Sequence, residues 1–206
     1  MSEGAEIEFG SGLAGILNGD GKRGPVIISH GAGRGMDAPI LETTAVKLAE
    51  LGFRVLRFNF AYMGLRPAPS AGGKKEQPEL VSAIEYMKQF GKPILVGKSF
   101  GARVSTFVAA DRDDIRALVF YGLPIVGMGK NPKPRDWSHL GKIKAPILFI
   151  TGKNDKLCPL DKLVVEQKYI TSQYASQVVP GDHSFKPKGE DEAIALCIDW
   201  IDKLPN

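Results

Sequence analysis

The sequence predicts an α/β fold in which helices cover both faces of a mostly parallel sheet, and three observations indicate it. Short runs rich in β-branched and aromatic residues alternate with longer helical patterns. Runs such as PVIIS (Pro25–Ser29) are apolar throughout, as expected for strands buried on both faces. No repeat or linker divides the 206 residues, so we expect a single domain over residues 1–206.

The first half of the chain begins with two short expected strands, AEIEF and LAGILNG, which favour a hairpin. After the PVIIS strand, APILETTAVKLAELG is predicted to be a helix that stops at Gly52, and FRVLRFNF is the next strand. A loop rich in Gly, Pro and Ala is expected from Ala61 to Lys75. QPELVSAIEYMKQFG then predicts a helix with Pro78 in its first turn and Gly91 after its end.

The second half continues the same alternation. The expected strands are PILVG, IRALVFYG, PILFITG and ASQVVPG, and the expected helices are SFGARVSTFVAAD, PLDKLVVEQKYI and EDEAIALCIDWIDKL. A connection rich in Pro and Gly, from Gly122 to Ala145, separates two of these strands. Because each helix follows a strand, successive strands are expected to run parallel.

Composition places the chain among ordinary globular proteins, with 43% hydrophobic and 24% charged residues. The net charge of +4 comes mostly from dispersed residues, with local concentrations only at Lys74–Lys75 and in GKNPKPR (129–135). We interpret these as solvated loops, although they would also attract an acidic ligand to a nearby cleft. No basic stripe with aromatic residues is present, so nucleic-acid binding is not expected.

The chain is expected to be cytoplasmic and not to bind membranes. No apolar run is long enough to span a bilayer, and the acidic start MSEGAEIEFG differs from a secretory signal. Cys158 and Cys197 form no C-x-x-C pair, which fits a reducing compartment.

Two motifs overlap in GKPILVGKSFGAR (residues 91–103). GKS (97–99) matches the end of a phosphate-binding loop, but that loop needs Gly at position 92, where the chain has Lys92. The residues in between, KPILV, are the predicted strand and cannot also wrap a phosphate. GKSFG (97–101) instead fits the strand–turn–helix G-x-S-x-G that exposes a nucleophilic serine. The sequence therefore predicts Ser99 as a nucleophile.

A serine nucleophile needs a base and a group that orients the base. His183 follows the last predicted strand, in GDHSF, and fits the chain order of nucleophile, acid and base. Asp155 follows the preceding strand, and parallel strands would place both loops at the edge that carries Ser99. Asp155 is therefore the expected acid. The weaker alternatives are Asp136, Asp161 and Asp182.

A tetrahedral intermediate also needs backbone N–H donors for its oxyanion. We expect one from Phe100, after the nucleophile, and one from HGAGRG after the PVIIS strand, with Ala32 favoured over Gly33. His30 is expected to hold this loop in place. Met36 stands where a dinucleotide-binding G-x-G-x-x-G needs Gly, and no metal-binding motif is present. No cofactor and no metal are expected.

HGAG, GKSFGAR, GKNDKLCP and GDHSFKP, in this order, resemble the motifs of the α/β-hydrolase superfamily over nearly the whole chain. SHGAGRGMDAP, FRVLRFNFAYM and GDHSFKP further resemble a compact branch related to dienelactone hydrolases, which includes relatives of testis-expressed and chromatin-complex hydrolase-like proteins. The resemblance implies an eight-stranded sheet with Ser99, Asp155 and His183 at the matching positions. Dienelactone hydrolases often use Cys where this chain has Ser99, so dienelactone is not the favoured substrate.

Members of this superfamily usually insert a cap after the sixth strand, where this chain has only the connection from Gly122 to Ala145. A minimal or absent cap and an open pocket are therefore expected. The expected substrate-binding residues are Arg34, Met36, Tyr62 and Trp137. Further wall candidates are Met63, Leu123 and Pro124, and further candidates for holding a substrate carboxylate are Arg66 and Lys98, although Lys98 would alternatively point into the structure. Core packing explains several of these residues equally well.

The favoured hypothesis is a serine hydrolase that cleaves a small ester or thioester through an acyl-enzyme, as a monomer or homodimer. One alternative is a non-catalytic binding or scaffold protein that retains the fold, since fold does not determine function. Another is a peptidase or acyltransferase that uses the same three residues.

Overall fold

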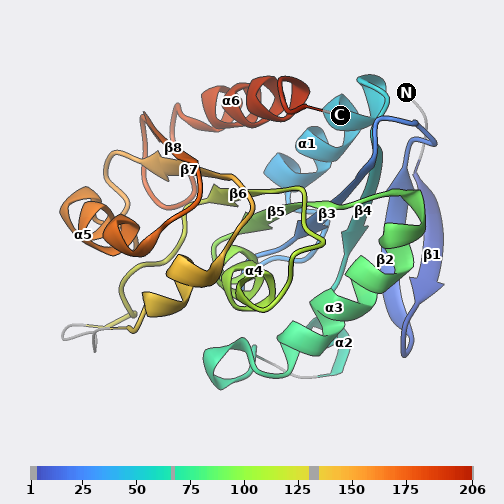
Figure 1. Ribbon diagram of the computed structural model, residues 1–206, viewed down its shortest axis with the longest axis horizontal. Helices are drawn as coiled ribbons and strands as arrows, with labels where there is room; N and C mark the ends of the chain where they lie inside the picture. Colours follow the sequence, from blue (N-terminus) through green and yellow to red (C-terminus); the bar gives the residue numbers. More distant parts are fainter. Residues whose placement is uncertain (1–3, 66–67, 130–134, 206) are drawn as a thin grey trace.

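The computed structural model describes residues 4–65, 68–129 and 135–205. Its centre is an eight-stranded sheet with the order β1-β2-β4-β3-β5-β6-β7-β8 (Figure 1). The strands are β1 (Ala5–Phe9), β2 (Leu13–Asn18), β3 (Pro25–Ser29), β4 (Arg54–Phe58), β5 (Ile94–Lys98), β6 (Ala117–Tyr121), β7 (Ile147–Gly152) and β8 (Tyr174–Val179). The expected sheet of eight strands is confirmed.

Strands β3 to β8 run parallel to one another, and among the described strands β2 alone runs in the opposite direction. β1 and β2 pair antiparallel, as expected, and β2 joins the sheet beside β4. All residues of β3 and β6 are buried, which explains why apolar residues dominate both strands. The parallel arrangement places the loops after β3, β5, β6, β7 and β8 at one edge of the sheet.

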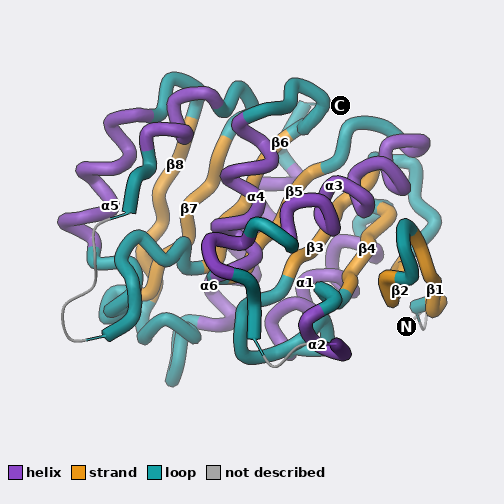
Figure 2. The backbone as a smooth tube through the Cα atoms, turned by 90° about the horizontal axis from the view of Figure 1, so that it is seen from below, coloured by secondary structure: helices purple, strands orange, loops and turns teal. Residues whose placement is uncertain are grey.

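Helices cover both faces of the sheet (Figures 1 and 2). One face carries α1 (Pro39–Glu50) and α6 (Glu190–Asp202), and the other carries α3 (Glu76–Met87) and α4 (Phe100–Ala110). The sheet separates two hydrophobic cores, one under each pair of helices. Another short helix, α5 (Leu160–Glu166), lies near β8.

The described residues of the loop expected from Ala61 to Lys75 include regular structure that the composition did not indicate. It contains the short helix α2 (Tyr62–Leu65) and a 3₁₀ turn at Ala71–Gly73. Further 3₁₀ turns lie at Lys88–Phe90 and Gln167–Tyr169, where the predicted helices were expected to continue. Helices often tighten into such turns at their ends.

The described part of the connection between β6 and β7 contains little regular structure. The described residues of this connection contain one 3₁₀ turn, Ser138–Lys142, and no α-helix.

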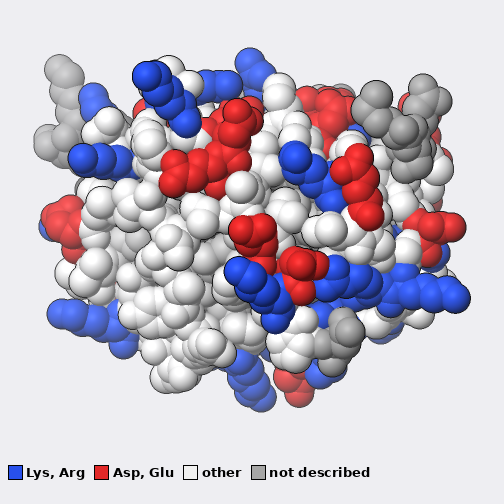
Figure 3. All heavy atoms as spheres, turned by 90° about the horizontal axis from the view of Figure 1, so that it is seen from above, with Lys and Arg blue, Asp and Glu red and all other residues white. Residues whose placement is uncertain are grey.

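Within residues 4–65, 68–129 and 135–205, no helix combines the length and apolar character needed to cross a bilayer. On the face that carries α1 and α6, basic and acidic side chains lie intermixed (Figure 3).

Candidate active site

Ser99 lies in the turn between β5 and α4, with φ 52° and ψ −110°. This positive φ is rare for a residue with a side chain and stores backbone strain. Glycines on both sides make the turn possible: a Cβ at Gly97 would lie 2.4 Å from Cα of Ala102, and a Cβ at Gly101 would lie 2.6 Å from the carbonyl oxygen of Ser29. The G-x-S-x-G spacing therefore follows from the close approach of α4 to the strands.

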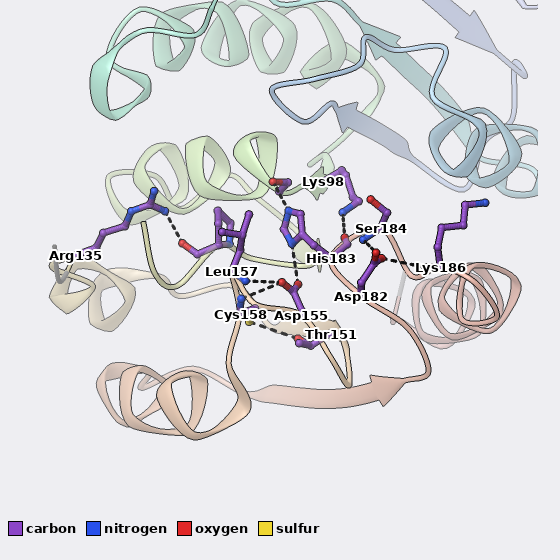
Figure 4. A network of polar contacts seen from close by, with 12 residues as sticks. Lys98, Arg135, Thr151, Asp155, Leu157, Cys158, Asp182, His183, Ser184 and Lys186 are labelled. Atoms are coloured by element: carbon purple, nitrogen blue, oxygen red, sulfur yellow. Dashed lines mark hydrogen bonds and ion pairs between the residues drawn. The ribbon is translucent and has the colours of Figure 1, made fainter. Parts of the chain in front are cut away.

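Ser99, His183 and Asp155 form a hydrogen-bonded line at the sheet edge. Oγ of Ser99 lies 2.7 Å from Nε2 of His183, and Nδ1 of His183 lies 2.8 Å from Oδ2 of Asp155 (Figure 4). A neutral ring with its proton on Nδ1 satisfies both contacts, because Nδ1 then donates to the carboxylate and Nε2 accepts from the hydroxyl. The Asp155 side chain is fully buried, whereas 23% of the His183 side chain is exposed.

Asp155 also holds its own loop. Its second carboxylate oxygen accepts hydrogen bonds from the backbone N–H groups of Leu157 (2.8 Å) and Cys158 (3.1 Å). The neighbouring Asp182 instead stabilises the loop after β8, since its Oδ1 accepts hydrogen bonds from the N–H groups of Ser184 and Lys186. Among the acidic residues considered from the sequence, Asp155 is the one that bonds to His183.

The loop after β3 lies against Ser99. A Cβ at Gly31 would lie 3.5 Å from Cβ of Ser99, so the residue before Ala32 lies against the nucleophile. Among the described residues, the N–H of Ala32 donates to no acceptor. Phe100 is the first residue of α4, a position whose N–H has no partner within the helix. Both amides remain available to a ligand, and their function as an oxyanion hole stays a prediction.

His30 fixes this loop, as expected. Its Nε2 accepts the N–H of Phe60 at 2.9 Å, so Nδ1 carries the proton and donates to the carbonyl of Gly31 at 2.8 Å. Burial lowers the pKa of His30, so the neutral ring is the stable form. The Tyr62 hydroxyl donates to the same Gly31 carbonyl at 2.9 Å. His30 thereby joins the loop after β3 to the end of β4.

The expected substrate-binding residues have different environments. Arg34 is exposed and Met36 is half-buried, with the Met36 N–H donating to Oδ1 of Asn59. Tyr62 and Trp137 are core residues with 2% and 1% exposure. Their polar atoms are already bonded, because the Trp137 indole N–H donates to the carbonyl of Ile125. A contact between these residues and a substrate stays a prediction.

Of the remaining pocket candidates, Met63 is 43% exposed, whereas Leu123 is buried. Arg66 lies outside the described residues. The Lys98 ammonium donates to the main-chain carbonyl of His183, so the alternative in which Lys98 points into the structure is confirmed.

Sequence reasoning missed Gly122, which lies directly after β6. Its φ is 63°, and a Cβ there would lie 3.2 Å from Oδ2 of Asp155 and 3.3 Å from Nδ1 of His183. A side chain would therefore press on the hydrogen-bonded pair. The signal in the sequence is a Gly at the end of a buried strand, the same signal that marks the loop after β3.

The sequence model of the alpha/beta hydrolase domain family matches residues 22–196 of this chain. An uncharacterized protein of Rickettsia prowazekii (strain Madrid E) is 25% identical over 161 residues, which are 72% of this chain and 65% of the relative. This chain therefore spans less than two thirds of the length of that relative.

Several solved structures have a similar fold. A protein of unknown function from Agrobacterium tumefaciens superposes with a TM-score of 0.80 at 23% identity, over 98% of this chain and 99% of that one. A dienelactone hydrolase from Anabaena variabilis has a TM-score of 0.79 at 21% identity, over 98% and 97% of the two chains. A serine hydrolase without a lid, from Xanthomonas campestris, has a TM-score of 0.75 at 22% identity, over 100% and 97%. At these identities the likeness shows a shared fold.

Proposed function

This chain belongs to the alpha/beta hydrolase family, and from this premise we propose that it is a serine hydrolase that cleaves a small ester or thioester. The observation that carries the proposal is the continuous line from the Ser99 hydroxyl through His183 to the buried Asp155 carboxylate. Nucleophile, base and orienting acid within hydrogen-bonding distance are what acyl transfer to a serine requires.

In the proposed reaction, Oγ of Ser99 attacks the substrate carbonyl carbon while Nε2 of His183 takes the hydroxyl proton. The Asp155 carboxylate holds the ring and stabilises its charged form. The N–H groups of Ala32 and Phe100 donate to the oxyanion of the tetrahedral intermediate. His183 then protonates the leaving alcohol or thiol, and an acyl-enzyme remains. A water molecule that gives its proton to His183 releases the acid and restores Ser99.

The short connection between β6 and β7 supports a small substrate without selecting one. Its described residues form no α-helix, and 23% of the His183 side chain is exposed. Arg34 and Met36 are the expected residues that lie nearest to solvent in this structure. A cytoplasmic location, a single domain over residues 1–206, and a monomer or homodimer complete the proposal.

A fluorophosphonate probe tests the proposal, because it reacts with activated serines. The wild-type protein is expected to be labelled, while Ser99→Ala abolishes labelling and His183→Ala reduces it by at least about 10³-fold, since the base is lost. A panel of p-nitrophenyl esters of increasing chain length then measures the size of the pocket.

The matched control is His139→Ala. The ring of His139 stacks on Phe107, and His139 is not part of the line formed by Ser99, His183 and Asp155. This variant is expected to keep the labelling rate as long as it folds. A folded wild-type protein that resists the probe would instead favour the binding or scaffold function.

A further inference from the structure

Two consecutive residues hold the same histidine. Ser99 bonds to the ring of His183 through Oγ, and the preceding Lys98 bonds to its main-chain carbonyl oxygen through Nζ at 2.5 Å. Lys98 is the last residue of β5, and Ser99 lies in the turn that follows the strand. The nucleophile and the lysine therefore reach His183 separately, one at the ring and one at the backbone. Figure 4 shows His183 between Lys98 and Asp155.

The carbonyl of His183 depends on this contact. Among the described residues, Lys98 is the only donor that this oxygen meets. Other parts of the loop are fixed by their own bonds: the N–H of Phe185 donates to the carbonyl of Asp182 at 2.9 Å, and Gly189 donates to the carbonyl of Phe185 at 2.8 Å. Removing the ammonium would leave the backbone of His183 itself without a tether.

The surroundings of Lys98 are unusual for a lysine. The ammonium lies 5.0 Å from the centre of the Phe185 ring, and Phe185 is fully buried with a positive φ of 61°. Lys98 makes no ion pair with a carboxylate of the described residues. Burial lowers the pKa of the Lys98 ammonium to about 8, and the carboxylates of Asp155, Asp182 and Glu190 offset this only in part. Buried groups with strongly shifted pKa values gather at functional sites.

We propose that Lys98 is a positioning residue of the active site, whose ammonium fixes the backbone of His183 so that the ring stays aligned between Ser99 and Asp155. The proposal rests on the proposed function, since it assigns Lys98 to the same reaction. Lys98 touches neither substrate nor reacting atoms and acts through His183 alone. Misplacement of a catalytic group by about 1 Å lowers rates by about 10²-fold. A residue that keeps the His183 ring aligned is therefore expected to have a large effect on the rate.

The test compares Lys98→Met and Lys98→Arg with Lys92→Met. Methionine keeps an unbranched stem and loses the ammonium, whereas arginine keeps a permanent charge and N–H donors. Lys92 precedes the same strand and also donates to a main-chain carbonyl, that of Asp113 at 3.3 Å, but at the opposite end. The measurements are the fluorophosphonate labelling rate, kcat and KM for a p-nitrophenyl ester, and Tm.

Lys98→Met is expected to lower kcat and the labelling rate by about 10- to 100-fold, with KM nearly unchanged because no substrate contact is lost. Lys98→Arg is expected to recover part of the rate, and Lys92→Met all of it. Titration with the probe gives the fraction of active sites, so a loss that merely reflects unfolded protein is recognised and would overturn the proposal.

The pH dependence adds a readout that a purely structural lysine would not change. The wild-type labelling rate is expected to fall as the pH rises through about 8, because the neutral amine is a weaker donor than the ammonium. The charged groups around Lys98 are Asp155, Asp182 and Glu190, and Lys186 pairs with Glu190. In Lys98→Arg this alkaline fall is expected to disappear, since the guanidinium stays charged.

The two proposals fail in different ways. A wild-type protein that reacts with the probe, together with a Lys98→Met variant that reacts equally fast, would overturn the positioning proposal and leave the hydrolase proposal intact. A folded wild-type protein that does not react would overturn both.

Discussion

Asp155 uses its two carboxylate oxygens for different partners. Oδ2 bonds to His183, and Oδ1 accepts the N–H groups of Leu157 and Cys158, so one buried side chain both orients the ring and closes its own turn. The turn-closing function and the orienting function of Asp155 are therefore compatible. The two carboxylate oxygens have different chemical functions, because only Oδ2 faces the His183 ring, which takes up and then gives up a proton in the proposed reaction.

Asp155→Asn separates the two functions. The amide oxygen can still accept from the loop, but the amide N–H₂ would face Nδ1 of His183 and favour the tautomer in which Nε2 carries the proton. We expect kcat to fall by about 10⁴-fold, with Tm within a few degrees of the wild type. The comparison variant is Asp161→Asn, in the first turn of α5, which is expected to keep full activity. An Asp155→Asn protein with wild-type turnover would remove Asp155 from the mechanism.

At the scale of the elements, the turn from β5 into α4 determines where the nucleophile stands. α4 packs so closely that Gly97 and Gly101 have no room for a side chain. The N–H of Gly101 donates to the carbonyl of His30, which ties the helix to the loop after β3. The nucleophile and the expected oxyanion loop are thus held by one packing contact.

Gly101→Ala is expected to disturb both the turn that carries Ser99 and the loop after β3. Its Cβ would lie 2.6 Å from the carbonyl and hydroxyl oxygens of Ser29 and 2.8 Å from the carbonyl of His30, so α4 must move. We expect a loss of about 1–3 kcal/mol in the free energy of unfolding, measured by urea denaturation, together with slower labelling by the probe. Gly64→Ala, at a site with nothing within 4 Å of the new Cβ, is the control. Equal stability of the two variants would contradict the packing argument.

At the scale of the whole molecule, the strand order assembles the site. β3, β5, β6, β7 and β8 are successive neighbours in the sheet and run parallel, so the loops that follow them meet at one edge. Residues separated by 84 positions, Ser99 and His183, come within hydrogen-bonding distance. The helices on each face keep the central strands β3 to β7 largely buried.

The half-buried Lys98 also couples the stability of the whole fold to pH. Its pKa is about 8 in the folded protein and 10.5 in an unfolded chain, so between these values the unfolded state binds more protons and the free energy of unfolding rises with pH. Relative to Lys98→Met, the wild type is expected to gain up to about 3 kcal/mol between pH 7 and pH 10.5. Urea titrations at both pH values measure this difference. Parallel changes in wild type and variant would show that burial does not shift this pKa.

The sequence by itself determined the order of strands and helices, the turn at Ser99 and the two loops that carry Asp155 and His183. Apolar runs, glycine spacing and chain order are local properties, and they remain readable in one dimension. The same local information left the loop from Ala61 to Lys75 without its short helix, because tertiary packing decides such marginal helices.

Only the tertiary structure decided which groups meet. The sequence contained several candidates for the acid that orients His183, and of these Asp155 is the one that the fold places within hydrogen-bonding distance. Tyr62 and Trp137 suited a pocket wall by residue type, yet the fold buries both and bonds their polar atoms elsewhere. By its position in the sequence, Lys98 was compatible with pointing toward the pocket or into the structure. Its hydrogen bond to the carbonyl of His183, in the loop after β8, decides between them. Alternation along a strand fixes the side from which a residue leaves, but what lies across the space it enters comes from residues far away in the chain.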